Sequence, residues 1–283
     1  MRSENNYSSL SSVCAFLVGF IVGILYTAFL LYLAVYGHAI PPYYYSNAKL
    51  KTYYKRNFTC TLEYYKELLA ELNKERYIVL RVIDFIRLYR KGKLPLQHKV
   101  IVILRHDVDW NIKKAREMSN LEAAYNVTST YYIRVRGPYN VLSKDVYSWL
   151  KWLNKNGFEV GLHYETLYFS GYNFTEAETL FLEDIELLRH IVPVYTVCSH
   201  GNIPHPKYIN YEIFVRNPDL YRLAKIEGEA YLTIGEIVKS LRPQCYKYLS
   251  DTYRRDINWI GILRSAKPGC IIYILIHPDN WIP

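Results

Sequence analysis

The sequence predicts an α/β fold in which parallel strands alternate with helices. Four largely apolar runs, rich in β-branched residues, have the length of buried strands. Segments with helical periodicity separate them, as in sheets or barrels built from strand–helix–strand units. Each run ends beside a histidine, and in such folds ligand chemistry lies just past the carboxyl ends of the strands. The four runs are residues 100–104, 158–162, 194–198 and 270–276.

The composition allows one sizeable domain with a hydrophobic core, since 51% of the 283 residues are hydrophobic. The net charge of +9 is unevenly distributed. Residues 49–99 hold thirteen basic and five acidic side chains, whereas residues 100–283 hold 21 and 20. A nucleic-acid surface needs its basic charge on the folded domain, so no nucleic-acid partner is expected. The position of the charge fits attraction to anionic lipid headgroups better.

Residues 1–11 are a polar tail, and residues 12–37 are predicted to be a single transmembrane anchor. Residues 13–36 carry no charge, and a helix of this length spans about 36 Å, enough to cross a bilayer. A signal peptide has a shorter apolar region, of about 7–15 residues. Gly19 and Gly23 lie one helical turn apart and could let a second membrane helix approach closely, although so short a pattern also arises by chance.

The side of the membrane on which the rest of the chain lies is left open. Arg2 precedes the anchor and several basic residues follow it, which by the positive-inside rule places the domain in the cytoplasm. Large domains can cross regardless of charge, and three glycosylation sequons, at Asn57, Asn126 and Asn173, point outward. We expect a single-pass membrane protein, with the extracytoplasmic side slightly favoured.

Residues 38–98 are predicted to form a basic linker and a helical segment. Pro41 and Pro42 favour extended chain directly after the anchor. Apolar residues at helical spacing predict one helix over residues 61–75 and another over residues 77–90. Both helices are expected to pack against the domain that follows.

The domain itself is assigned to residues 99–283. Its patterns predict one further strand, over residues 128–135, and a loop-rich region over residues 203–250 that holds one helix. Strands that alternate with helices in this way are typical of a parallel sheet or barrel. The predicted helices cover residues 112–125, 143–153, 176–190 and 234–241.

The five cysteines include no Cys-x-x-Cys pair, which disfavours a zinc–thiolate site. One disulfide among those outside the anchor is possible if the domain faces an oxidising space. Cys198 and Cys270 lie in apolar runs and are interpreted as buried small hydrophobes. The remaining cysteines are Cys14, Cys60 and Cys245.

Polar side chains follow the strand ends where a ligand site is expected. Asp107 and Asp109 are two residues apart, so a strand would direct both to one face. Two neighbouring carboxylates need a cation to stay ionised together, although a loop-capping pair is the structural alternative. His106 is set aside because alternation turns it away from Asp107. The other runs are followed by histidines, each of which could also be structural: His163, His200 and His277.

From residue 100 to its end, the chain resembles the NodB-homology polysaccharide deacetylases, the carbohydrate esterase family 4 group. The resemblance covers roughly 180 residues and follows the branch whose first motif is Asp-x-Asp after an Arg-His pair. It implies a deformed (β/α) barrel of NodB type. It is carried by four motifs: Arg105-His106-Asp107-Val108-Asp109, Gly161-Leu162-His163-Tyr164-Glu165, Ser199-His200-Gly201-Asn202 and Leu275-Ile276-His277-Pro278.

The resemblance also implies roles for the motif residues. Members of the family hold Zn²⁺ or a similar divalent ion with one aspartate and two histidines. By position in the motifs, Asp107 would be the general base and His277 the general acid. Asp109 and His163 would bind the metal.

The sequence departs from the family at two places. Many members carry a second histidine ligand four residues after the first, where this chain has Leu167; His200, at the next strand end, is the replacement we expect. The family's Arg-x-x-x-Pro-Tyr segment is missing after the second motif. A similar run, residues 136–139, comes before that motif instead. We therefore treat residues 136–139 only as a candidate substrate loop. Asp251 is a candidate for orienting the base or the acid, with a plain loop aspartate as the alternative. The substrate-binding candidates are therefore Trp110, Arg136, Tyr139 and Asp251.

Together these features predict a membrane-anchored, metal-dependent hydrolase that removes N-acetyl groups from a glycan. A divalent metal, expected to be Zn²⁺, would supply an acidified water; Asp107 would take its proton and His277 would protonate the departing amine. The expected partners are the N-acetylated glycan and the bilayer. Two alternatives stay open. One is a hydrolase of another C–N bond. The other is a catalytically inactive glycan-binding or scaffolding domain of the same fold, because Leu167 stands where many family members have a histidine ligand.

Overall fold

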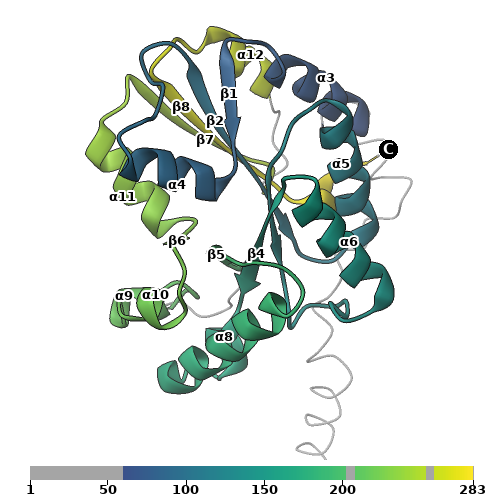
Figure 1. Ribbon diagram of the computed structural model, residues 1–283, viewed down its shortest axis with the longest axis vertical. Coiled ribbons are helices and arrows are strands. Elements are labelled where there is room, and N and C mark those ends of the chain that lie inside the picture. The colour runs from purple at the N-terminus through teal and green to yellow at the C-terminus, as the bar shows by residue number, and fades with distance from the viewer. Residues whose placement is uncertain (1–59, 202–207, 253–257, 283) are drawn as a thin grey trace, which may run out of the picture. The chain divides into compact units, whose positions relative to one another are not determined.

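Eight parallel strands form one sheet at the centre of the computed structural model, which describes residues 60–201, 208–252 and 258–282 (Figure 1). The strand order is β6-β5-β4-β3-β2-β8-β7, and β1 also pairs with β2. Among the described strands β6 and β7 do not pair, so the sheet is a half-barrel that is open between them. The strands are β1 Tyr77–Leu80, β2 Val100–Val108, β3 Thr130–Ile133, β4 Glu159–Tyr164, β5 Thr196–Ser199, β6 Gly228–Glu229, β7 Cys245–Ser250 and β8 Cys270–Ile276.

Strand β2 is central, and every one of its residues is buried. On one edge β1 pairs with its first half, as far as Leu80 opposite Ile103, and β3 pairs with its second half, from Thr130 opposite Arg105. On the other edge it pairs with β8. A strand covered on both faces needs apolar side chains throughout, which explains the unbroken run at residues 100–104.

Helices pack around the strands: α3, α5 and α6 lie on one side of them in Figure 1, and α4 and α11 lie on the other. Five helices begin after a Thr, Ser or Asn whose side chain accepts a hydrogen bond from the amide three residues on, as an N-cap does. The helices are α3 Leu62–Leu72, α4 Val82–Arg90, α5 Ile112–Ala124, α6 Lys144–Lys155, α7 Thr166–Phe169, α8 Phe174–Arg189, α9 Glu212–Arg216, α10 Leu220–Leu223, α11 Leu232–Leu241, α12 Trp259–Ser265 and the short 3₁₀ helix η1 Pro278–Asn280.

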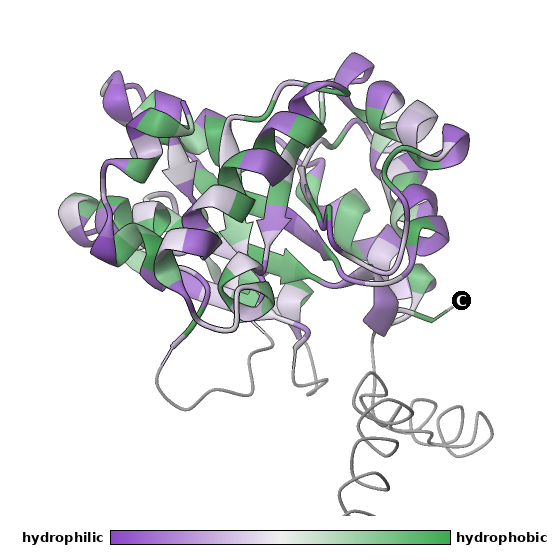
Figure 2. Ribbon diagram, turned by 90° about the horizontal axis from the view of Figure 1, so that it is seen from below, coloured by the Kyte–Doolittle hydropathy of each residue, from purple (hydrophilic) through white to green (hydrophobic). Residues whose placement is uncertain are grey.

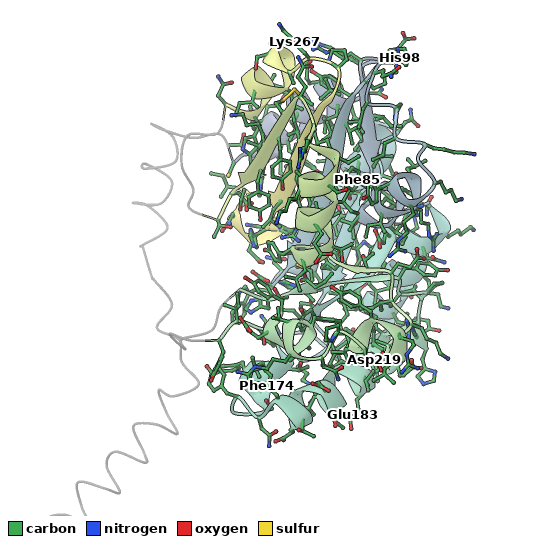
Figure 3. All side chains as sticks on the ribbon, turned by 90° about the vertical axis from the view of Figure 1, so that its left-hand side faces the viewer. Phe85, His98, Phe174, Glu183, Asp219 and Lys267 are labelled. Atoms are coloured by element: carbon green, nitrogen blue, oxygen red, sulfur yellow. A yellow bond between two sulfur atoms is a disulfide. The ribbon has the colours of Figure 1, made fainter. Side chains whose placement is uncertain are left out.

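The inner face of the half-barrel is filled from α4 and α11. Phe85 of α4, labelled in Figure 3, is fully buried in the same cluster as Ile101 and Ile103 of β2. Hydrophobic residues, green in Figure 2, lie on the central strands and on parts of the helices around them. Because side chains alternate along a strand, Ile101 and Ile103 share their face with Asp107. The inner face of β2 is therefore apolar along its first half and becomes polar from Arg105 onward.

Gly161 of β4 marks a close approach between neighbouring strands. A Cβ atom at this position would lie 2.4 Å from Cε1 of Tyr132 and 2.7 Å from the carbonyl oxygen of Thr196. The Tyr132 ring on β3 occupies that space, and its hydroxyl is 2.8 Å from Oγ1 of Thr196. Glycine is therefore required for the tyrosine ring to lie inside the half-barrel.

The prediction of one helix over residues 77–90 was wrong in its first part. Tyr77–Leu80 is strand β1, and the helix begins only at Val82. Arg81 between them has an extended backbone, with ψ of 158°. The reason is tertiary: the four residues of β1 are consecutive partners of β2, and this pairing outweighs the local helical periodicity.

Strand β7 was also missed, in the region predicted to be rich in loops. Its central residues Tyr246, Lys247 and Tyr248 are exposed at the open edge of the half-barrel, so no apolar run marks the strand. The strands predicted from the four runs and from residues 128–135 are confirmed with small shifts at their ends. The predicted helices from residue 112 onward, and the helix over residues 61–75, are confirmed in the same way.

The polar tail, the predicted anchor and residues 38–59 lie outside the described residues. Within the part of the chain that the structure describes, no helix combines the length and the apolar character that a membrane crossing requires. Residues 60–98 contribute α3, β1 and α4 to the same sheet and core as the rest of the domain.

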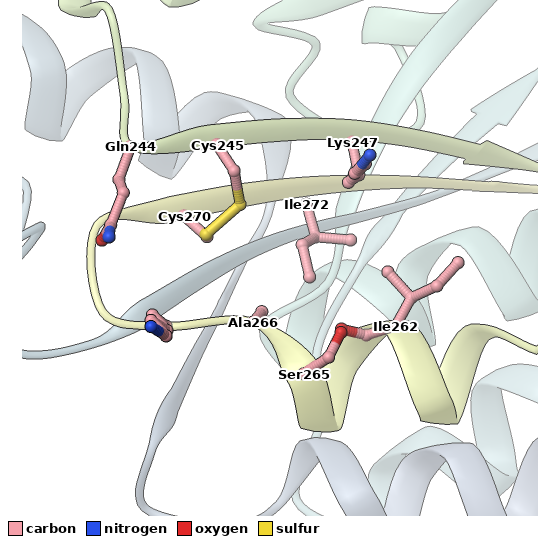
Figure 4. Close-up of a pocket in the computed structure, with 9 residues that line it drawn as sticks. Gln244, Cys245, Lys247, Ile262, Ser265, Ala266, Cys270 and Ile272 are labelled. Carbon is pink, nitrogen blue, oxygen red and sulfur yellow. A yellow bond between two sulfur atoms is a disulfide. The ribbon is translucent and has the colours of Figure 1, made fainter.

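Cys245 and Cys270 form a disulfide between β7 and β8 (Figure 4). They are opposite each other at the first positions of these strands, with Cα atoms 4.5 Å apart. Interpreting Cys270 as an unpaired hydrophobe was therefore wrong, because the pairing of β7 with β8 places the two sulfurs together. Cys198 is confirmed as a free, buried thiol.

A cavity of about 300 Å³ lies beside the disulfide, at the amino-terminal ends of β7 and β8.

Candidate active site

The carboxyl ends of β2, β4, β5 and β8 bring the predicted site residues to one end of the half-barrel. Asp107 and Asp109 share the inner face, as alternation predicts, and His106 points to the outer face. There His106 is fully buried, stacks on Tyr131 with ring centroids 4.4 Å apart, and has Nε2 2.7 Å from Oε1 of Glu122. His106 therefore stays out of the site, as expected.

Asp109, His163 and His200 direct their ligand atoms at one another; we call them the Asp-His-His triad. Asp109 Oδ1 lies 3.3 Å from Nε2 of His163 and 3.4 Å from Nε2 of His200. The two imidazole rings have centroids 5.1 Å apart and planes inclined by 75°. Three ligand atoms that lie within 4.8 Å of one another thus converge from the ends of three strands.

The triad fits a divalent metal ion. Nδ1 of His163 donates to the carbonyl of Cys198 (3.0 Å), because a carbonyl can only accept, so Nε2 presents a lone pair toward Asp109. Oδ1 of Asp109 is buried and has no hydrogen-bond donor among the described residues, which is costly for a carboxylate oxygen unless a cation satisfies it. Two imidazole nitrogens and a carboxylate oxygen are a zinc ligand set that leaves one position open for water.

The electrostatics of the triad favour the carboxylate form of Asp109. Burial by itself raises the pKa of Asp109. The neighbouring imidazoles of His163 and His200 outweigh burial and hold this pKa well below its usual range. Asp109 is therefore negatively charged at neutral pH, as a metal ligand must be.

Asp107 lies beside the triad without being part of it. Its Oδ2 is 3.8 Å from Nε2 of His163 and 3.5 Å from Nη2 of Arg105. The thiol of Cys198 donates to the same oxygen over 3.6 Å, and burial raises the pKa of this thiol well above its usual value. Asp107, His163 and Cys198 also form a compact group, but the protonated thiol and the Arg105 cation disfavour a metal ion there.

Arg105 is fully buried beneath Asp107, inside an enclosure of aromatic rings. Its guanidinium lies 4.2 Å from the ring centroid of Tyr231, 5.1 Å from that of Tyr273 and 5.9 Å from that of Tyr132. Burial lowers the pKa of Arg105, but the charge of Asp107 and the surrounding groups raise it well above its usual value. Asp107 thus has a fixed cation beneath it.

His277 is held by Asp251, which is fully buried. Nδ1 of His277 is 2.6 Å from Oδ1 of Asp251. Oδ2 of the same carboxylate accepts from the backbone amide of His277 and from Nε1 of Trp281, both at 2.8 Å. Burial lowers the pKa of His277, but the hydrogen bond and charge of Asp251, with the charges of Asp107 and Asp109, raise it to about 9. Of the two residues that Asp251 was a candidate to orient, Asp107 and His277, the structure shows its carboxylate in contact with His277.

Replacing Asp251 with Asn is expected to lower the pKa of His277 from about 9 toward its usual value of 6.5 in the metal-free protein, because the hydrogen bond and charge of Asp251 no longer oppose burial. A raised histidine pKa stabilises the fold below the unfolded value of 6.5, and this stability is lost as the pH rises through about 9. The shift is worth on the order of 3 kcal/mol. NMR titration of the His277 ring, with urea unfolding below and above this window, measures both effects. An unchanged titration midpoint in Asp251→Asn would contradict the assignment.

The substrate-binding candidates lie in different surroundings. The Trp110 side chain is 54% exposed next to Asp109, and its ring lies 5.5 Å from the guanidinium of Arg134. The hydroxyl of Tyr139 donates to the carbonyl of Val108 (2.7 Å), so it braces the end of β2. Arg136 forms ion pairs with Asp184 and Glu183 of α8, at 2.9 and 3.4 Å, and has no contact with the triad.

Three functional residues were missed in the sequence. Arg105 lies two residues before Asp107 and therefore on the same face of β2, which is a signal that alternation offers. Glu165 lies two residues after His163 and was quoted within a motif without a role. Arg134 follows β3 directly, but its partner could not be identified without the pairing of β3 with β2 and β4.

No family model and no curated protein matches the chain. Among solved structures it is similar to the Streptococcus pyogenes deacetylase PplD in complex with acetate, with 12% identity, coverage of 76% of this chain and 83% of that chain, and a TM-score of 0.42. It is also similar to a family 4 carbohydrate esterase from Bacillus anthracis, with 12% identity, coverage of 77% of this chain and 79% of that chain, and a TM-score of 0.35.

Proposed function

We propose that this protein is a metal-dependent hydrolase that removes acetyl groups from the amide nitrogen of an N-acetylated glycan. The observation that carries the proposal is the Asp-His-His triad with an acid and a base beside it. The buried Oδ1 of Asp109 has no donor among the described residues and faces two imidazole nitrogens. A domain that only bound sugar would have no use for such an arrangement.

Asp109, His163 and His200 would hold the metal ion, and their donor set suits Zn²⁺. When bound there, such an ion supplies an acidified water and a Lewis acid. Leu167, which occupies the position of the family's usual second histidine, is fully buried in the core. His200 completes the ligand set from the next strand, and this favours an active enzyme over an inactive domain of the same fold.

Asp107 and His277 divide the proton transfers. Asp107 is buried beside the triad, with Arg105 as counter-charge, and it takes the proton of the attacking water. His277, whose pKa is raised to about 9, carries a proton at neutral pH and donates it to the departing amine. Asp251 holds Nδ1 of His277, which leaves Nε2 for the substrate. The products are acetate and a free amino sugar.

The substrate class is supported by the resemblance of the four motifs and by Trp110. An exposed indole face next to Asp109 is suited to stacking against a sugar ring.

We also propose that residues 12–37 anchor the protein in a membrane, with the domain on the extracytoplasmic side. The absence of charge from residues 13–36 supports the anchor, and the disulfide supports an oxidising compartment.

The proposal is tested on the purified full-length protein, stripped with a chelator and then reloaded with one equivalent of Zn²⁺. Acetate release from N-acetylglucosamine oligomers is expected only after reloading. Release from small acetamides but not from the oligomers would favour a hydrolase of another C–N bond. Binding of oligomers with neither Zn²⁺ uptake nor acetate release would overturn the proposal in favour of a binding domain.

A further inference from the structure

We infer that Glu165 is the positioning residue for the third metal ligand, His200, and that Arg134 holds Glu165 in place for this task. The inference rests on the proposed function, since it requires that the triad binds a metal. Both residues lie at strand ends next to the triad, and both are at least nine-tenths buried. Neither is needed as a ligand, a base or an acid.

The two ring nitrogens of His200 face carboxylates on opposite sides. Nε2 lies 3.4 Å from Oδ1 of Asp109, and Nδ1 lies 3.4 Å from Oε2 of Glu165. Nδ1 is buried and has no closer hydrogen-bond partner among the described residues. A carboxylate on the Nδ1 side favours the tautomer that carries its proton there, which leaves the lone pair of Nε2 for a metal ion.

The two histidine ligands are therefore oriented by different means. Nδ1 of His163 donates to a backbone carbonyl, that of Cys198. His200 has its backbone fixed, because its amide donates to the carbonyl of Tyr164 (2.8 Å) and its carbonyl accepts from Nδ2 of Asn210 (2.7 Å). Among the described residues, only the Glu165 side chain is left to set the rotation and the tautomer of the His200 ring from its Nδ1 side.

Arg134 determines which carboxylate oxygen of Glu165 faces His200. Nε of Arg134 donates to Oε1 of Glu165 (2.9 Å), and Nη2 donates to the same oxygen. This leaves Oε2 directed toward His200. Nη1 of Arg134 donates to the backbone carbonyl of Asp109 (3.2 Å). One guanidinium thus connects the segment that carries the aspartate ligand to the carboxylate that orients the histidine ligand, which a single-point cation such as lysine could not do.

The experiment compares Glu165→Gln with the wild type as full-length proteins. Zn²⁺ affinity, measured by competition with a chromophoric chelator, is expected to fall by about 10- to 100-fold, as for other groups that orient metal-bound histidines. In the metal-free protein, ¹⁵N NMR of the imidazoles is expected to show a loss of the Nδ1-protonated form of His200 but not of His163. A residue that only stabilised the fold would leave this tautomer balance unchanged.

Glu183→Gln is the control, since Glu183 also pairs with an arginine, Arg136, but contacts no histidine among the described residues. It should bind Zn²⁺ as the wild type does. Arg134→Lys covers the case in which Glu165→Gln fails to fold, and its affinity is expected to fall by about tenfold. Wild-type affinity in Glu165→Gln, or in Arg134→Lys if only that variant folds, would overturn the inference. Equal Zn²⁺ binding by the wild type and Asp109→Ala would instead overturn the proposed function.

Discussion

Asp109→Ala is expected to abolish metal binding and activity together. Asp109 supplies the anionic ligand of the triad, and its Oδ1 lies within 3.4 Å of both histidine nitrogens. Loss of a group that merely orients a ligand costs about 10- to 100-fold in metal affinity. Loss of the ligand itself should therefore cost at least about 100-fold and reduce acetate release to the background rate. Zinc content after dialysis and acetate release from the same preparation measure both effects.

Asp145→Ala is the control for this substitution. Asp145 is exposed and pairs with Arg116 across 2.9 Å, away from the triad. The variant loses a carboxylate of the same kind, and it should keep full zinc content and activity. One equivalent of Zn²⁺ retained by Asp109→Ala would show that the ligand assignment is wrong.

Asp107→Asn is expected to keep the metal and lose turnover. The amide has the shape of the carboxylate but cannot accept the proton of the attacking water. Removing a general base costs about 10²- to 10⁴-fold in rate. Asp107 is 3.8 Å from Nε2 of His163, further than Asp109 is, so the triad should stay intact. The measurement is kcat on N-acetylglucosamine oligomers at full zinc occupancy.

Comparing the zinc content of Asp107→Asn with that of Asp109→Ala shows which of the two compact ligand groups of the structure binds the metal. If Asp107→Asn lost its zinc while Asp109→Ala kept it, the metal would belong to the group of Asp107, His163 and Cys198. Substitution of Cys198 would then also release the metal. If both aspartate variants kept their zinc, neither group would be the site.

The central part of the fold could be predicted because its strands are buried on both faces. Burial of β2 requires an uninterrupted apolar run, and such a run is visible in the sequence. The strand β7 could not be predicted, since an exposed edge strand needs no such run. Strand β1 could not be separated from α4, because its conformation depends on pairing with β2, twenty or more residues further along the chain.

The side chains that converge at the candidate site could be predicted, whereas two of those that contact them from neighbouring strand ends could not. Asp107, Asp109 and the histidines follow strand ends, so topology alone brings them together. Arg134 and Glu165 act through contacts between adjacent loops, and these contacts depend on the relative positions of the β3 and β4 ends. Arg105, by contrast, lies two residues before Asp107 on the same strand, so alternation alone offers a signal for its contact with Asp107.

The disulfide between Cys245 and Cys270 helps to fix the strand register that brings Asp251 to His277. Cys245 and Cys270 are the first paired residues of β7 and β8. Five residues further along, Ser250 is paired with Leu275. The next residues along each strand lead to Asp251 and His277, whose side chains meet. Since β7 pairs with no other described strand, only β8 and the sulfur bridge fix its register. A slip of one step would move the carboxylate by about 3.3 Å and turn it to the other face. Reduction of the disulfide at one end of the sheet is therefore expected to weaken the pairing that places Asp251 against His277 at the other end.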